Sequence, residues 1–272
     1  MRIDKPPDSP VLTPGQVIRL RGVNPDDDDF RFDVAVLCFR GQTASCQVLD
    51  AFPVSRIEPD ILYGSPAHAG RVGDKRIVIL PKVIWGGPVT AILLEELACL
   101  GVQTAIGLGA AGSLVSPRHV GRMLIADRAL CSDGASQQYT DQPTVSPAPE
   151  LFELAVALAS QEGEEPIVGM IHTTDALYQE WPARIRQWRE AGASFVNLET
   201  SPFYAVAAYL GIRAVYLGLV TDYVGDPGEW QHTFWGRPST TDPLIVKIIQ
   251  QLVQADDTRQ GSRVELQDCH HG

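Results

Sequence analysis

The stretch "NLETSPFYAVAAYLGIRAVYLGLVTDY", Asn197 to Tyr223, predicts a helix that leads directly into a buried strand. Four apolar side chains recur at helical spacing from Pro202 onward: Phe203, Val206, Ala207 and Leu210. Thr200 or Ser201 can cap this helix and Gly211 ends it, because hydroxyl side chains favour N-caps and glycine favours the residue after the last turn. The run "RAVYLGLVT" that follows is almost wholly apolar, which is typical of a strand covered on both faces.

The same alternation of strand and helix continues through the rest of the chain. Five further apolar runs predict buried strands: "FDVAVLCF", "RIVILPKVIW", "QTAIGLG", "RMLIADRAL" and "PIVGMIHT". A second helix is predicted from Pro88 to Leu100, with proline in its first turn and Gly101 as its stop signal. A chain of 272 residues with 44% hydrophobic content can form one large domain or two small ones, and we predict one α/β domain.

The two ends of the chain differ in composition from this core. Residues 1–30 contain several prolines and the acidic run Asp26–Asp29, a composition that resists regular structure. We therefore predict an N-terminal arm over residues 1–30, a domain over residues 31–256 and a polar tail over residues 257–272.

Composition excludes several classes of function. The formal net charge of −11 repels phosphodiester backbones, so we expect no nucleic-acid partner. No apolar run reaches the ~18 residues that a membrane span needs, and the N-terminus lacks the apolar core of a secretory signal. We expect a cytoplasmic protein without membrane contact. The five cysteines form no CxxC pair, so we expect reduced thiols and no metal site.

Three segments lie where predicted strands end, the place at which ligands gather in open α/β sheets. They are Gly107–Ser113 ("GLGAAGS"), Glu199 and Asp222. Each has an ordinary structural interpretation: a small-residue turn between strand and helix, a solvated acid at a helix N-terminus, and a turn former. We favour a functional interpretation because all three would meet at one edge of the sheet.

The glycine-rich segment is not a dinucleotide fingerprint. Gly107, Gly109 and Gly112 match the G-x-G-x-x-G spacing, but that spacing alone is a weak signal. The following residues, "SLVSPRHVG", contain two helix breakers where the phosphate-binding helix would begin.

Six motifs occur in the same order between Asp33 and Gln254 as in a known family. They are "WGGPVTAILLEELACLGV", "AIGLGAAGSL", "DGAS" followed by Tyr139, "TTDALY", "NLETSPFYAVAAYLGI" and "LVTDY". Through them the chain resembles the nucleoside phosphorylases of the hexameric purine nucleoside and uridine phosphorylase class, with their nucleosidase relatives. We therefore expect a single domain with a mixed twisted central sheet flanked by helices. The resemblance also implies a homo-oligomer, a dimer or a trimer of dimers, because sites in that family borrow residues across a dimer interface.

The resemblance assigns the two acids to the cleavage of a ribosyl C–N bond. This reaction passes through an oxocarbenium-like state, so it needs a carboxylate near the sugar and a proton donor for the departing base. Glu199 would accept hydrogen bonds from the ribose 2′- and 3′-hydroxyls. Asp222, protonated, would donate to purine N7, which favours a purine over uridine.

Other substrate-binding residues follow from the same resemblance. Asn197 and Leu198 belong to the ribose motif, with Leu198 in place of the family's methionine. Leu177 and Tyr178 would pack on the base, although an aromatic residue after a strand is often a core residue. The loop "DYVGDPGEWQHTFW" is either a packed Ω-loop or a lid in which Trp230, His232, Phe234 or Trp235 covers the 5′ side of the nucleoside.

The residues expected to bind the nucleophile, phosphate or water, differ most from the pattern of the family. Three positions would contact phosphate or water through the backbone: Gly109, Ala110 and Gly112. The family's phosphate-binding arginine stands at Gly107 of this chain, its hydroxyl residue at Ala110, and a further arginine at Trp230. The nearest cation in the first-strand loop is Arg40. Phosphate needs several charge-assisted donors, so these losses weaken the expected phosphate site.

The resemblance thus implies phosphorolysis of a purine nucleoside or a 5′-modified analogue, with ribose 1-phosphate as product. Inorganic phosphate would be a co-substrate, and no cofactor is expected. A nucleosidase that uses water on the same fold is one alternative, and a catalytically silent nucleoside-binding protein is another. Sequence leaves the base, the 5′ substituent and the nucleophile open.

Overall fold

The strand β1 (Val34–Cys38) shows how an apolar run builds the core. All of its residues are buried, and their side chains alternate between two hydrophobic clusters. Ala35 and Leu37 join one cluster, whereas Val34 and Val36 join the other. Successive side chains of a strand point to opposite faces, so this strand needs a layer of structure on each side.

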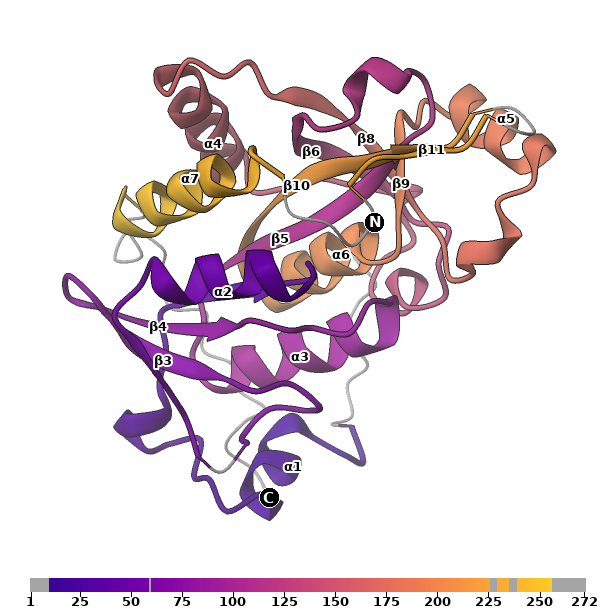
Figure 1. Ribbon diagram of the computed structural model, residues 1–272. Helices are drawn as coiled ribbons and strands as arrows, with labels where there is room; N and C mark the ends of the chain where they lie inside the picture. Colours follow the sequence, from indigo (N-terminus) through magenta and orange to yellow (C-terminus); the bar gives the residue numbers. More distant parts are fainter. Residues whose placement is uncertain (1–9, 59, 226–228, 235–238, 256–272) are drawn as a thin grey trace.

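The computed structural model describes residues 10–58, 60–225, 229–234 and 239–255 (Figure 1). Within this described part, 11 strands form one mixed sheet in the order β11-β10-β6-β8-β9-β5-β1-β4-β3-β2, with β7 paired to β6. The remaining strands are β2 (Val54–Arg56), β3 (His68–Val72), β4 (Lys75–Leu80), β5 (Thr104–Ser113), β6 (Met123–Leu130), β7 (Thr144–Val145), β8 (Ile167–Thr173), β9 (Phe195–Asn197), β10 (Arg213–Tyr223) and β11 (Gln231–His232). β10 also pairs with β5, so the pairings of β5, β10, β6, β8 and β9 close into a ring.

Helices cover both faces of this sheet. The described helices are α1 (Pro14–Leu20), α2 (Gln42–Asp50), α3 (Gly87–Cys99), α4 (Pro149–Gln161), α5 (Pro182–Glu190), α6 (Thr200–Leu210) and α7 (Asp242–Ala255). Short 3-10 turns lie between them: η1 (Asp28–Phe30), η2 (Pro117–His119), η3 (Ser136–Gln138) and η4 (Leu177–Gln179). α2, α4 and α7 pack on one face of the sheet, and α3 and α6 pack on the other (Figure 1).

The predicted fold class is confirmed: the described residues form a single α/β domain with a mixed sheet flanked by helices. Each of the six apolar runs coincides with much or all of one strand, and the two predicted helices are α3 and α6. Gly211 ends α6 in the left-handed conformation, as predicted, but the predicted N-cap is wrong. Its N-cap is Glu199, and Thr200 and Ser201 lie inside the first turn. The side-chain oxygen of Asn197 takes the capping role, because it accepts a hydrogen bond from the Thr200 N–H at 3.3 Å.

The expectation of an irregular N-terminal arm is wrong for residues 14–20, which form α1. Pro14 begins the helix rather than preventing it, and Thr13 and Gln16 form a reciprocal capping box. Ile18 is fully buried, and Arg21 forms a 2.9 Å ion pair with Glu96 of α3. This part of the arm therefore packs on its own domain. The predicted tail lies outside the described residues.

None of the described helices combines the length and the apolar character that crossing a bilayer demands. In the same part of the chain, no group of three or more His, Cys, Asp or Glu side chains is arranged to hold a metal ion.

Candidate active site

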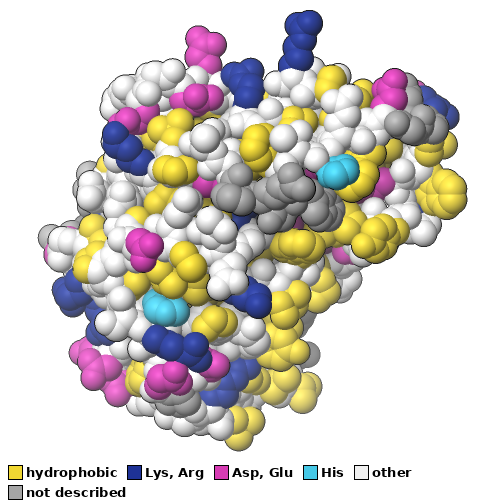
Figure 2. All heavy atoms as spheres, in the orientation of Figure 1, with side chains coloured by type: hydrophobic (Ala, Val, Ile, Leu, Met, Phe, Trp, Pro, Cys, Tyr) yellow, Lys and Arg dark blue, Asp and Glu magenta, His cyan; other side chains and the backbone are white. Residues whose placement is uncertain are grey.

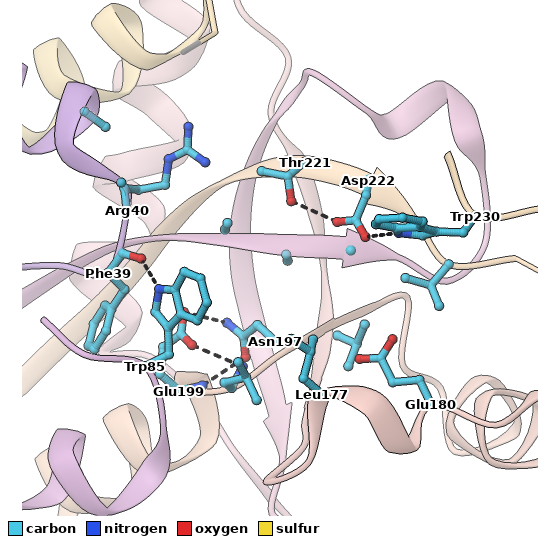
Figure 3. Close-up of a pocket in the computed structure, with 18 of the residues that line it drawn as sticks. Phe39, Arg40, Trp85, Leu177, Glu180, Asn197, Glu199, Thr221, Asp222 and Trp230 are labelled. Carbon is cyan, nitrogen blue, oxygen red and sulfur yellow. Dashed lines mark hydrogen bonds between the residues drawn. The ribbon is translucent and has the colours of Figure 1, made fainter. Parts of the chain in front are cut away.

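Sheet pairing brings the predicted site segments together. Gly112 on β5 pairs with Asp222 on β10 and with Val196 on β9. Glu199 follows β9 directly, at the start of α6. Asp222 and Glu199 therefore lie on either side of β5, and both line a cavity of about 540 Å³ (Figure 3).

Glu199 is held by donors on both of its carboxylate oxygens. The Tyr216 hydroxyl donates to Oε1, and the Asn197 amide reaches the same oxygen at 3.4 Å. The Leu198 N–H donates to Oε2 at 3.1 Å. Only 3% of the residue is exposed, and this burial raises the pKa of Glu199 to about 7 against the opposing effect of the Tyr216 and Leu198 donors. These donors thus fix the orientation of the carboxylate on the cavity wall.

Asn197 and Leu198 both line the cavity, as predicted, but in different ways. The Asn197 amide nitrogen donates to the Thr200 hydroxyl at 2.6 Å and to the Tyr216 hydroxyl at 3.2 Å, and its oxygen accepts from the start of α6. These bonds show that Asn197 organises the Glu199 loop. Leu198 contributes an apolar side chain to the wall.

Asp222 lies across the cavity with two donors of its own. Its Oδ1 accepts from the Thr221 hydroxyl at 2.8 Å, and its Oδ2 accepts from the Trp230 indole at 2.9 Å (Figure 3). Burial is the main reason that the pKa of Asp222 is raised, and the two donors oppose it. The donor to Oδ2 is therefore a neutral indole, at the position where the resemblance implied an arginine.

The predicted lid is only partly described. Trp230 lines the cavity although 54% of it is exposed. His232 is exposed on β11 and does not line the cavity, and its ring centroid lies 4.3 Å from that of Trp230. A contact between His232 and substrate stays a prediction. Strand pairing determines the position of His232, because β11 pairs this residue with Asp222 on β10. Trp235 lies outside the described residues, so a lid over the 5′ side stays a prediction.

Leu177 and Tyr178 belong to η4 at the mouth of the cavity. Leu177 is half-buried on the wall, which fits a contact with a flat base. Tyr178 also lines the cavity but is 90% exposed, so its ring lies at the rim.

Glu180 and Trp85 also line the cavity, although the sequence did not single them out as site residues. Glu180 lies on the wall near Asp222, and burial followed by the Asp222 charge raises its pKa to about 7. In "YQEWPARIR" this glutamate looks like any acid before a polar helix. Trp85 is the last residue of the apolar run "RIVILPKVIW", and it donates its indole N–H to the Phe39 carbonyl at 2.7 Å (Figure 3). Only the fold brings either residue to the cavity.

The glycine-rich segment is not a turn, which corrects the prediction. Gly107 to Ser113 continue β5, paired with β10 and β9. Ala110 and Gly112 line the cavity, as expected of nucleophile-binding positions, but Gly109 does not. A Cβ atom at Gly109 would lie 1.6 Å from the Tyr216 hydroxyl, so this glycine accommodates a side chain of β10 instead of a ligand.

Arg40 does reach the cavity, but it is already paired. Its Nη2 lies 2.9 Å from both carboxylate oxygens of Asp242, in the first turn of α7. The side chains are only 6% and 2% exposed, so this is a buried ion pair. Next to it, Gln42 and Thr43 at the start of α2 form part of the wall. The predicted cation is thus present, with its charge largely neutralised.

With this geometry established, comparison with known proteins identifies the family. A family model described as the phosphorylase superfamily matches residues 42–254. The chain belongs to this superfamily. It is 32% identical over 203 residues to a uridine phosphorylase of Haemophilus influenzae, covering 68% of this chain and 78% of that protein. It is 34% identical over 131 residues to a guanosine phosphorylase of Halorubrum lacusprofundi, covering 47% and 54%.

A solved structure shares the fold. The futalosine hydrolase of Helicobacter pylori matches with a TM-score of 0.68 and 18% identity, over 83% of this chain and 99% of that one. The family resemblance inferred from the six motifs is therefore confirmed.

Acidic side chains outnumber basic ones on the described cavity wall. Among the lining residues that the structure describes, Arg40 is the one arginine or lysine. Four carboxyl groups line the same cavity: Glu180, Glu199, Asp222 and Asp242. A multiply charged anion would meet more negative than positive groups on this wall.

Proposed function

We propose that this protein cleaves the N-glycosidic bond of a purine nucleoside or a 5′-modified analogue. One observation carries the proposal: Glu199 and Asp222 lie on either side of β5 and line one cavity. A reaction that builds positive charge on a sugar and negative charge on a leaving base needs one acid at each end. A catalytically silent binding protein has no use for that pairing.

Each acid has a role suited to its surroundings. Glu199, ionised and held by three donors, accepts hydrogen bonds from the ribose 2′- and 3′-hydroxyls and stabilises the oxocarbenium-like state. Asp222, whose raised pKa favours the protonated form, donates its proton to purine N7 as the C–N bond breaks. Pyrimidines offer no N7, which is why a purine is the proposed base.

The wall charges favour water as the nucleophile. Phosphate at neutral pH carries up to two negative charges and requires several charge-assisted donors. The described wall offers one arginine, Arg40, already bound to Asp242. Gly107 and Ala110 add neither a cation nor a hydroxyl. Neutral water needs no such donors, so hydrolysis to free ribose fits this wall better than phosphorolysis.

Phosphorolysis remains the second candidate for a specific reason. The first residues of α2, Gln42 and Thr43, adjoin Arg40 on the cavity wall, and a helix N-terminus favours anions. Two relatives are named phosphorylases. If phosphate is used, we expect half-saturation in the millimolar range or above, because each ~1.4 kcal/mol of lost binding costs a factor of ten.

The deciding experiment incubates the protein with inosine, adenosine and 5′-methylthioadenosine, with and without phosphate, and identifies the sugar product. Free ribose, or 5-methylthioribose from methylthioadenosine, at a rate independent of phosphate supports the hydrolytic proposal. Ribose 1-phosphate formed at micromolar phosphate refutes it in favour of a phosphorylase. No product from any nucleoside refutes cleavage altogether and favours a binding protein.

We further propose that the protein forms homo-oligomers. Three aromatic residues on the cavity wall are half or more exposed: Trp85 at 52%, Tyr178 at 90% and Trp230 at 54%. Hydrophobic side chains also gather along the concave right-hand edge of the face in Figure 2. A second copy of the chain would bury such surface. Sedimentation equilibrium tests this, and a monomer at micromolar concentration would contradict it.

A further inference from the structure

Tyr216 on β10 occupies space that β5 leaves free. In the parallel pairing of these strands Tyr216 lies opposite Gly107. A Cβ atom at Gly107 would lie 2.7 Å from the Tyr216 ring, and one at Gly109 would lie 1.6 Å from its hydroxyl. Two glycines of β5 are therefore needed to seat one tyrosine. The family's phosphate-binding arginine, expected at Gly107, would collide with this ring.

Packing above Gly107 and Gly109 fixes the direction of the Tyr216 hydroxyl. The residue is fully buried, and its ring packs against Phe39 and Phe203 with centroid distances of 6.3 and 6.1 Å. Its hydroxyl donates to Glu199 Oε1 and accepts from the Asn197 amide at 3.2 Å. The phenol keeps its proton because burial, and then the Glu199 charge, raise its pKa well above the usual value.

We propose that Tyr216 is a positioning residue that sets both the orientation and the ionisation of the ribose carboxylate Glu199. Tyr216 does not line the cavity and acts only through Glu199. Its hydroxyl donates to the ionised form of that carboxylate, and therefore favours ionisation against the effect of burial.

The other charged groups near Glu199 do not supply this effect. Arg40 and Asp242 neutralise each other at the α2 and α7 end of the cavity. Glu180 and Asp222 form the opposite end. The described hydrogen bonds to the Glu199 carboxylate come from Tyr216, Asn197 and Leu198, and Tyr216 is the one titratable group among these three.

The test compares Tyr216→Phe with Tyr139→Phe. Tyr139 is a matched control, because its hydroxyl also donates to a glutamate, Glu95, at 2.7 Å, and it lies outside the cavity wall. The first measurement follows the side-chain carboxyl carbon of Glu199 by ¹³C NMR as a function of pH, with Glu199→Gln to assign the signal. The midpoint of this titration is expected to move to higher pH in Tyr216→Phe and to stay in place in Tyr139→Phe. An unchanged midpoint in Tyr216→Phe, or an equal shift in the control, overturns the proposal.

The second measurement uses a nucleoside that the protein cleaves, and so rests on the proposed function. Loss of the Tyr216 hydroxyl is expected to lower kcat about 10- to 100-fold at pH 7, with a smaller change in KM. The acidic limb of the pH profile moves upward together with the NMR midpoint. If the acidic limb of the pH profile does not move in Tyr216→Phe, Tyr216 has only a structural role.

A second variant covers the case in which Tyr216→Phe does not fold. If Tyr216→Phe does not fold, 3,5-difluorotyrosine at position 216 nearly preserves the ring volume and makes the phenol a stronger donor, so the Glu199 midpoint should move to lower pH. A midpoint that stays or rises would count against the proposal. If no nucleoside is cleaved, the proposed function fails, but the NMR titration still tests the role of Tyr216.

Discussion

Glu199→Gln should make the protein more stable at alkaline pH while making it nearly inactive. Burial raises the pKa of Glu199 from an ordinary value of 4.5 to about 7. The folded state therefore binds this proton more tightly than the unfolded state does, and stability falls as pH rises from about 4.5 to about 7. A change of this size corresponds to about 3 kcal/mol of unfolding free energy above neutrality. Glutamine is close to glutamate in shape and carries no charge to bury.

The assay measures thermal unfolding of wild type and variant at pH 5 and pH 8, at one protein concentration. The difference in unfolding free energy between the variant and wild type should be about 3 kcal/mol more favourable to the variant at pH 8 than at pH 5. For a chain of this size, this corresponds to roughly 6 °C in Tm. Turnover should fall about 10²-fold or more, because the lost charge acts mainly on the oxocarbenium-like state.

Glu95→Gln is the matched control, since Glu95 also accepts from a tyrosine hydroxyl but lies outside the cavity wall. It should leave turnover unchanged. If the difference between Glu199→Gln and wild type is the same at pH 5 and pH 8, the reasoning about a buried charge is wrong. If turnover is unaffected, the ribose assignment fails.

Three further predictions concern the rest of the cavity. Asp222→Asn should abolish cleavage of purine nucleosides and spare a nitrophenyl riboside, whose leaving group needs no proton; equal loss on both substrates would indicate a structural role. Arg40→Met should cost about 3–5 kcal/mol in urea unfolding, because it leaves Asp242 buried without its cation; a loss below about 1 kcal/mol would show that the pair is solvated. Gly109→Ala should lower both stability and kcat, because its Cβ meets the Tyr216 hydroxyl at 1.6 Å; unchanged kinetics and Tm would contradict the packing derived for β5.

Local patterns are enough to predict the framework. A strand buried on both faces must be apolar throughout, so six runs of sequence identify six central strands. The ends of such strands meet at one edge of the sheet, and this rule alone places Glu199 and Asp222 in the same site. Both are features that a window of about ten residues can reveal.

Contacts between distant residues cannot be predicted in the same way. The local pattern of the glycine-rich segment favours a turn, because nothing near it reveals that Tyr216, on another strand, needs the room above Gly107 and Gly109. Likewise, Arg40 meets Asp242 across most of the chain, so its charge cannot be judged from its neighbours in sequence.

Composition misleads the prediction at the N-terminus for a different reason. Proline breaks regular structure at most positions, yet at the first position of a helix its missing N–H costs nothing. Pro14 in α1 is such a case, and Thr13 adds the cap.

The proposed mechanism requires opposite protonation states for two buried carboxyl groups at the same pH, and the fold provides for both. At the ribose end, Glu199 faces only hydrogen-bond donors, each of which favours its ionised form. At the base end, Asp222 also accepts from donors, but it shares this end with Glu180, whose pKa is raised to about 7 by burial and then by the Asp222 charge. Two neighbouring acids do not both ionise readily, so one proton stays with the Asp222 and Glu180 pair near neutral pH. The base end can thus hold a proton, while the donors at the ribose end favour an ionised Glu199, and glycosidic cleavage of a purine needs this combination.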